Sequence, residues 1–140
     1  CYTVNLPLAA GMEDADYDAL YRRIAVPIAR SFDPDLVLVS AGFDAHHRDP
    51  HAGMNLTARG FGRICSRVQE VAEGCAAGRL VLTLEGGYDL DGLSNSVEAC
   101  TRVLAGDVPD EIDDSPSRAG TDAVADLGEH HAKFWTDALS

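Results

Sequence analysis

The sequence lacks any apolar run close to the roughly 20 residues that a membrane-spanning helix needs. It is also poor in positive charge, with 11 Lys and Arg against 23 Asp and Glu, and its formal net charge is −12. A nucleic-acid-binding protein needs a basic face to neutralise phosphates, so this class is excluded. The acidic excess fits either a solubility adaptation or the attraction of cationic substrates such as polyamines and lysine-rich peptides. We therefore expect no nucleic-acid partner and no membrane partner.

The sequence also lacks a CxxC pair among its four cysteines. Cys65, Cys75 and Cys100 fall on expected helices, where we interpret them as small buried apolar residues in a reducing, cytoplasmic protein. A disulfide frame or a zinc knuckle is not favoured. The sequence also shows no signal peptide, and it opens at Cys1 without an initiator methionine. This opening leads us to expect the C-terminal part of a longer protein.

What the sequence does contain is the composition of one globular domain with a real core. It has 140 residues, of which 46% are hydrophobic and 24% are charged. Two apolar runs dominate it, Leu36–Val39 and Leu80–Leu82, and each leads into glycine within a few residues. Strands that are apolar on both faces are typical of parallel sheets covered by helices on both sides.

Three strands and three helices are expected in the order β-α-β-α-β-α. The first strand is an alternating segment over residues 2–8, stopped by Pro7, and the other two are the apolar runs. This alternation predicts an α/β fold, a three-layer α/β/α domain with a parallel sheet, over residues 1–106. Because three strands make a narrow sheet, we expect an exposed sheet edge, and a homo-oligomer could form through this edge or through the C-terminal helix.

The helices are predicted from their apolar stripes and their capping residues. Pro27 lies inside the first stripe and is expected to kink the helix or end it near Val26. The expected N-caps are, in chain order, Asp14 or Asp16, then Thr57, then Asp89 or Asp91.

The composition changes after Gly106. Residues 107–120 are rich in Asp, Glu, Pro and Ser and are expected to form an acidic linker. Residues 121–140 are expected to form one amphipathic C-terminal helix that carries the only Trp. Its apolar face must dock on this domain, on a partner or on sequence beyond these residues.

The two apolar strands each lead to a side chain with reactive potential, Asp44 and Tyr88. Since ligands bind outside the carboxyl ends of parallel strands, we expect both side chains in one crevice. Asp44 fits a metal ligand, a general base or a helix cap. Tyr88 follows Gly86 and Gly87 and fits either a hydroxyl donor to a carbonyl that gains charge or a packed aromatic residue.

The five histidines do not form an evident metal site. His46 and His47 are adjacent, so their side chains are expected to diverge, and His51 follows Pro50 in the same polar loop. A solvated or substrate-facing role is favoured for these three residues. His130 and His131 lie on the last expected helix, where neighbours point about 100° apart.

Four short stretches, read together, are similar to a known family. They are Ser40–His46, Asp49–Pro50, Asn55–Thr57 and Leu84–Tyr88. In this order and spacing they resemble the zinc-dependent histone deacetylase superfamily, with its arginase/deacetylase-like fold. The closest resemblance is to the class II-like and bacterial branch, which includes acetylpolyamine amidohydrolases and acetoin-utilisation proteins. It runs from about residue 2 to residue 106, the C-terminal part of the family's domain only.

The resemblance implies a site and a reaction. Asp44 would be a zinc ligand, and Tyr88 would donate to the oxygen of the scissile amide in an acetylated lysine peptide or an acetylated polyamine. The substrate pocket would include Phe43, His51, Gly86 and Gly87, with His51 where many members have an apolar residue. The backbone carbonyl of Tyr2 matches a position that binds a structural monovalent cation in some members.

The same resemblance indicates what these residues do not supply. The family's other two zinc ligands, on an Asp-x-His motif, and its paired proton-handling histidines lie upstream of the matching region. The 140 residues are therefore expected to be inactive alone. The alternative hypothesis is a non-catalytic interaction or structural module on a deacetylase-like scaffold.

Overall fold

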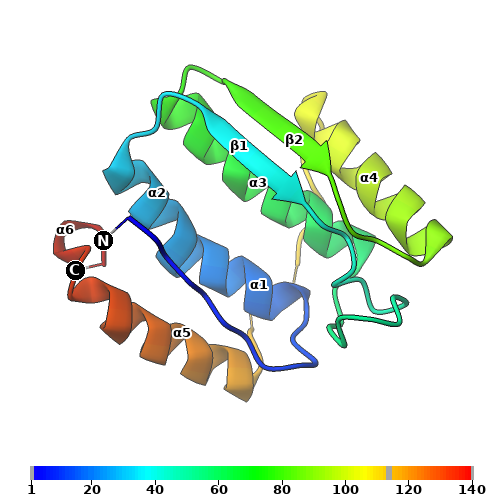
Figure 1. The fold of residues 1–140 in the computed structure, drawn as a ribbon, viewed down its shortest axis with the longest axis horizontal. Helices are drawn as coiled ribbons and strands as arrows, with labels where there is room; N and C mark the ends of the chain where they lie inside the picture. Colours follow the sequence, from blue (N-terminus) through cyan, green and yellow to red (C-terminus); the bar gives the residue numbers. More distant parts are fainter. Residues whose placement is uncertain (1, 113–114, 140) are drawn as a thin grey trace.

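The structure is a computed structural model that describes residues 2–112 and 115–139. Figure 1 shows helix α3 behind the two strands, helix α4 to the side of β2, and helix α5 beside helix α1. The elements are, in chain order, α1 (Asp14–Leu20), the π-helical segment η1 (Tyr21–Ala25), α2 (Val26–Phe32), β1 (Val37–Ala41), α3 (Ala58–Cys75), β2 (Leu80–Leu84), α4 (Leu90–Leu104), α5 (Arg118–Ala132) and α6 (Thr136–Leu139).

The sheet consists of β1 and β2, which pair in parallel from Val37 opposite Leu80 to Ala41 opposite Leu84. The expected parallel α/β class is confirmed, but the strand expected over residues 2–8 is not present. This segment alternates in burial along its length, yet no strand of the described residues lies beside it to complete a ladder. An extended segment without such a neighbour has the alternating burial of a strand, but its backbone groups have no adjacent strand with which to form ladder hydrogen bonds.

One face of the sheet is covered and the other is bare. Ala41 and Leu82 pack against a core cluster shared with α3 and α4. On the opposite face, Leu38 is 70% exposed and Val81 is 50% exposed. Both strands are apolar on both faces, as expected for a three-layer fold, but the described residues supply only the sheet and the helices on one side of it (Figure 1).

The helix that contains Pro27 does not end near Val26, which was one of the two expected outcomes; its regular α-helical turns are instead interrupted just before the proline. The chain passes from α1 through η1 into α2, and Pro27 lies in the first turn of α2. Proline has no backbone N–H and its ring obstructs the preceding turn. The π-helical turn directly before it is wider than an α-helical turn. It therefore provides room for the proline ring at the point where the backbone hydrogen bond is missing.

The N-caps of the later helices are confirmed, whereas the first cap differs. Thr57 accepts from the N–H of Gly60, and Asp89 accepts from the N–H of Gly92. The N-cap of α1 is Glu13, and the two candidate aspartates lie inside the helix. Asp14 instead faces the start of α3, where its carboxylate accepts from the Thr57 N–H at 2.8 Å and from the Thr57 hydroxyl at 2.6 Å.

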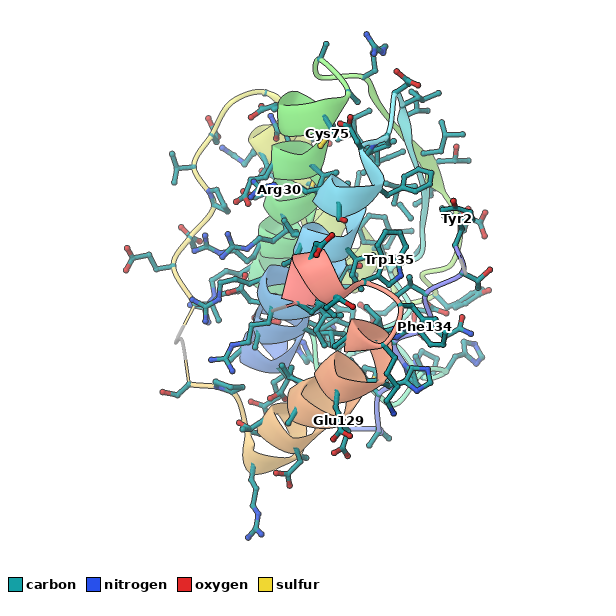
Figure 2. All side chains as sticks on the ribbon, turned by 90° about the vertical axis from the view of Figure 1, so that its left-hand side faces the viewer. Tyr2, Arg30, Cys75, Glu129, Phe134 and Trp135 are labelled. Carbon is teal, nitrogen blue, oxygen red and sulfur yellow. The ribbon has the colours of Figure 1, made fainter. Side chains whose placement is uncertain are left out.

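The C-terminal region packs on the first helix. It forms two helices rather than one, since α5 begins at Arg118 and a break after Ala132 precedes the short α6. Figure 2 shows Trp135 and Tyr2 on the same side of the molecule, and their ring centroids are 6.4 Å apart. The second core cluster joins α1, η1 and α2 to α5; its buried members are Ala19, Leu20, Ile24, Ile28 and Val124. The apolar face with the Trp therefore docks on this chain itself.

None of the helices in the described part of the chain is both long enough and apolar enough to cross a membrane.

Candidate active site

The segments that follow β1 and β2 lie side by side beyond the ends of the strands. The N–H of Glu85 donates to the carbonyl of Ala41 at 3.0 Å, and the N–H of Phe43 donates to the carbonyl of Gly86 at 2.8 Å. The ladder thus continues past both strands. It brings Asp44 and the Gly86–Tyr88 turn to one end of the sheet.

Asp44 lies directly against Gly86. A Cβ atom at Gly86 would be 3.1 Å from the carboxyl carbon of Asp44 and 3.2 Å from its Oδ2. Within the described residues, the Asp44 carboxylate takes part in no hydrogen bond and no ion pair. Its half-buried oxygens therefore remain available as ligands, and this arrangement does not fit a helix cap.

Gly87 gives the turn its shape. Its φ is +137°, in the region that favours glycine, and a Cβ there would lie 2.9 Å from Cδ1 of Leu93 and 3.2 Å from Cβ of Phe43. No other residue type fits this position without displacing neighbours. The two glycines therefore have separate tasks: Gly86 leaves space for Asp44, and Gly87 allows the turn that presents Tyr88.

Tyr88 projects from this turn towards solvent and is 63% exposed. Its ring contacts the ring of His51 edge-to-face, with centroids 4.7 Å apart and planes at 81°. The structure thus brings two sequence-predicted site residues together from segments 37 positions apart. The alternative of a packed, buried aromatic residue at position 88 does not hold for the described structure.

Asp49 holds these two residues in place through their backbones, a role that the sequence did not reveal. Its Oδ2 accepts from the N–H of Tyr88 at 2.7 Å, and its Oδ1 accepts from the N–H of His51 at 3.0 Å. Burial alone would raise the pKa of the Asp49 carboxyl, but the N–H donors of Tyr88, His51 and Asp89 hold this pKa below its ordinary value. The contact with His51 is a local turn typical of aspartate.

The polar loop that carries Asp49 is also tied to the start of α4. The guanidinium of Arg48 lies 3.2 Å from Oδ1 of Asp89 and 3.0 Å from Oδ2 of Asp91. Asp89 is the N-cap of α4, so the loop and the turn before this helix are joined at a second point. Both connections restrict the position of the Gly86–Tyr88 turn.

His46 and His47 do not diverge as expected, and their ring centroids are only 4.3 Å apart. His46 is 4% exposed, and its Nδ1 accepts from the N–H of Arg48 at 3.3 Å. Burial lowers the pKa of His46, and the neighbouring His47 lowers it further. Nδ1 of His47 lies 3.1 Å from the carbonyl oxygen of Leu56. A solvated or substrate-facing role for His46 is therefore wrong.

Phe43 is placed differently from the expected pocket residue. It is 5% exposed, belongs to the core cluster, and packs on Phe61 with ring centroids 5.0 Å apart. Its ring supports the end of β1 from the core side, whereas Tyr88 and His51 face solvent. It lines an apolar cavity of about 170 Å³ together with Tyr17. Burial raises the pKa of Tyr17, and the nearby Tyr21 and Asp44 raise it further.

The described residues do not complete a metal site. Among residues 2–112 and 115–139, no group of three or more His, Cys, Asp or Glu side chains is arranged to hold a metal ion. A hydrolytic zinc site usually has three protein ligands. Asp44 fits one such ligand, because its oxygens are unengaged and lie at the sheet end beside Tyr88.

Comparisons with known proteins agree on one family. Residues 1–104 match the family model described as "Histone deacetylase domain". Histone deacetylase 10, chloroplastic, of Oryza sativa subsp. japonica is 38% identical over 136 residues, which are 91% of this chain and 30% of that protein. Histone deacetylase 15 of Arabidopsis thaliana is 36% identical over 138 residues, 96% of this chain and 24% of that protein.

Two solved structures superimpose closely. The crystal structure of the HDA15 HD domain gives a TM-score of 0.85 at 36% identity and covers 98% of this chain and 36% of its own. The structure of the histone deacetylase Clr3 gives a TM-score of 0.89 at 32% identity and covers 99% of this chain and 23% of its own. The chain thus spans less than a third of the curated relatives that it matches here. From its sequence match and its α/β fold, this chain belongs to the histone deacetylase family.

Proposed function

We propose that the protein containing these residues is a zinc-dependent amide hydrolase that deacetylates lysine side chains. The observation that carries the proposal is the meeting of Asp44 with the Gly86–Tyr88 turn at the end of the parallel strands. In a chain of the histone deacetylase family, this pairing joins an unengaged carboxylate to an exposed phenol.

In this proposal Asp44 is one ligand of the metal. A bound zinc ion supplies a water of lowered pKa and polarises the substrate carbonyl. Asp44 contributes one negatively charged oxygen donor, and Gly86 keeps the space beside it free of side-chain atoms. The exposed hydroxyl of Tyr88 donates a hydrogen bond to the substrate oxygen as that oxygen gains charge.

The remaining ligands and proton-handling groups are proposed to come from residues outside these 140. Two apolar hollows offer room for further strands beside β1. One, of about 320 Å³, lies between residues 2–6 and α2, and the other, of about 300 Å³, lies between α2 and β1. The two hollows adjoin each other, because Ala25 and Ala29 line both. Together the hollows extend from the N-terminal segment to the free edge of β1.

Strands placed in this space would end beside Asp44. In a parallel sheet all strands have their carboxyl ends at the same edge. Figure 2 shows Tyr2, in the N-terminal segment, on the same side of the helices as the strands. The position of the free space beside β1 therefore supports a site whose missing part is added next to Asp44.

The test uses the full-length protein, with zinc content and hydrolysis of an acetyl-lysine peptide as readouts. Asp44→Ala should lose both zinc and turnover, whereas Tyr88→Phe should keep zinc and lose about 100-fold or more in kcat. Asp122→Ala is the matched control, because Asp122 is exposed on α5. Its ion-pair partner among the described residues is the exposed Arg118, whose Nε lies 3.9 Å from Oδ2 of Asp122.

Two outcomes would contradict the proposal. An Asp44→Ala protein with normal zinc and turnover would exclude the ligand role. A full-length protein without zinc or deacetylase activity would favour the non-catalytic module. An acetylpolyamine tested in parallel separates the two substrate classes, and the 140-residue segment alone is expected to bind no stoichiometric zinc and to show no turnover.

A further inference from the structure

We propose that Asp49 is a positioning residue for the proposed reaction, and that it sets the place of the Tyr88 hydroxyl and of the His51 ring together. This inference rests on the proposed function of Tyr88. Asp49 is 9% exposed and lies where the polar loop meets the Gly86–Tyr88 turn. Each of its two carboxylate oxygens accepts a backbone N–H, one from Tyr88 and one from His51.

The turn needs such support because its own residues provide little. Two glycines precede Tyr88, and Gly87 has a φ of +137°, so no side chain of these residues fixes the backbone. The N–H of Tyr88 donates to Oδ2 of Asp49 at 2.7 Å, across 39 positions of the sequence. This bond fixes the peptide plane from which the Tyr88 side chain departs.

A small error in this plane has a large effect at the hydroxyl. The phenol oxygen lies at the end of a long rigid side chain, so a modest rotation of the backbone displaces it by about 1 Å, enough to lower turnover about 100-fold. The same carboxylate holds His51, whose ring contacts the Tyr88 ring at 4.7 Å. Asp49 thereby fixes the two exposed rings relative to each other.

The charge of Asp49 matters because only the ionised carboxylate presents acceptors on both oxygens. The N–H donors of Tyr88, His51 and Asp89 hold the pKa of Asp49 below its ordinary value and so favour the ionised form. Arg48, the neighbouring cation, is directed to Asp89 and Asp91 instead. An asparagine at this position would offer one acceptor oxygen and an NH₂ group that faces one of the two N–H donors.

The experiment is a double-mutant cycle in the full-length protein, with kcat and KM for an acetyl-lysine peptide and zinc content as readouts. Asp49→Asn should lower kcat about 10- to 100-fold with little change in KM or zinc content. In the Tyr88→Phe background, Asp49→Asn should change kcat by less than about twofold, because the hydroxyl through which Asp49 acts is absent. Asp122→Asn, on the exposed side of α5, is the matched control.

The outcomes separate this inference from the proposed function. If Tyr88→Phe strongly lowers kcat but the two effects are additive, or if Asp49→Asn has no effect, the positioning role of Asp49 is overturned while the function of Tyr88 stands. If Tyr88→Phe itself is near wild type, both are overturned. Where Asp49→Asn does not fold, Asp49→Glu keeps the charge, displaces the acceptors by one methylene, and should show the same dependence on the Tyr88 hydroxyl.

Discussion

The carboxylate of Asp16 accepts a hydrogen bond from the N–H of Ser117, 101 positions away, at 2.7 Å from Oδ1. Its other oxygen, Oδ2, accepts from the N–H of Glu13 at 3.0 Å. One side chain therefore serves the first turn of its own helix α1 and the start of α5. Asp14, two positions earlier and on the opposite side of α1, serves the start of α3 through Thr57. Free N–H groups at a helix start need such acceptors, and the helix dipole favours negative charge there.

Asp16→Ala should lower the free energy of unfolding by about 0.5–2 kcal/mol, because the N–H groups of Glu13 and Ser117, at the starts of two helices, lose their shared acceptor. Urea unfolding of the protein measures this loss. Gly120→Ala offers a second route, since a Cβ there would overlap the Asp16 carboxyl group. Gly128→Ala, in the same helix with no atom within 4 Å, is the matched control and should be neutral or stabilising. Equal stability of the two glycine variants would contradict the shared cap.

Gly86→Ala should lower zinc occupancy and turnover of the full-length protein, because the added methyl group would lie 3.1–3.4 Å from the carboxylate atoms of Asp44 and displace them. The comparison variant is Gly74→Ala, near the end of α3, where no atom lies within 4 Å. It should leave activity unchanged and raise the free energy of unfolding by about 0.5–1 kcal/mol. Normal zinc content in Gly86→Ala would show that Asp44 tolerates the displacement or does not bind the metal.

Stability should fall as the pH is lowered from above the ordinary histidine pKa of about 6.5, in part because of His46. The pKa of the folded His46 is depressed, so between the two values the unfolded chain binds a proton that the folded chain does not. The contribution of His46 is complete above the ordinary pKa, decreases through this window, and changes no further below the folded pKa. Urea unfolding at several pH values measures the slope.

The matched variant is His46→Asn, whose side-chain oxygen can still accept from the N–H of Arg48. It should be less stable than the wild type at pH 7.5, because the contact of the His46 ring with Phe61 is lost. Its stability should also depend less on pH between about 7.5 and 5.5. An unchanged slope would assign the pH dependence to other groups.

Features encoded by neighbouring residues could be predicted from the sequence. The two apolar runs form the parallel strands, and Thr57 and Asp89 cap the helices that were expected after them. The meeting of Asp44 with the Gly86–Tyr88 turn follows from the general rule that parallel strands end at one edge. The family and its fold were also predicted and are confirmed by the comparisons. The roles of Asp44 and Tyr88 remain predictions.

Features that depend on distant partners could not be predicted. Residues 2–8 have the alternation of a strand, but pairing needs a neighbour that the local pattern cannot reveal. Asp49 reads as an ordinary turn aspartate before proline, and nothing local indicates its bond to Tyr88. The burial of His46 and its stacking on His47 likewise depend on Phe61 and the start of α4, which are distant in sequence.

The bare face of the sheet leads us to expect an attraction between copies of this segment in solution. Exposed Leu38 and Val81 favour contact between two such faces, because contact would remove apolar surface from water. The formal net charge of −12 opposes that contact by mutual repulsion. Salt screens the repulsion but does not weaken the apolar attraction. We therefore expect ionic strength to govern whether the isolated segment stays dispersed or self-associates through this face.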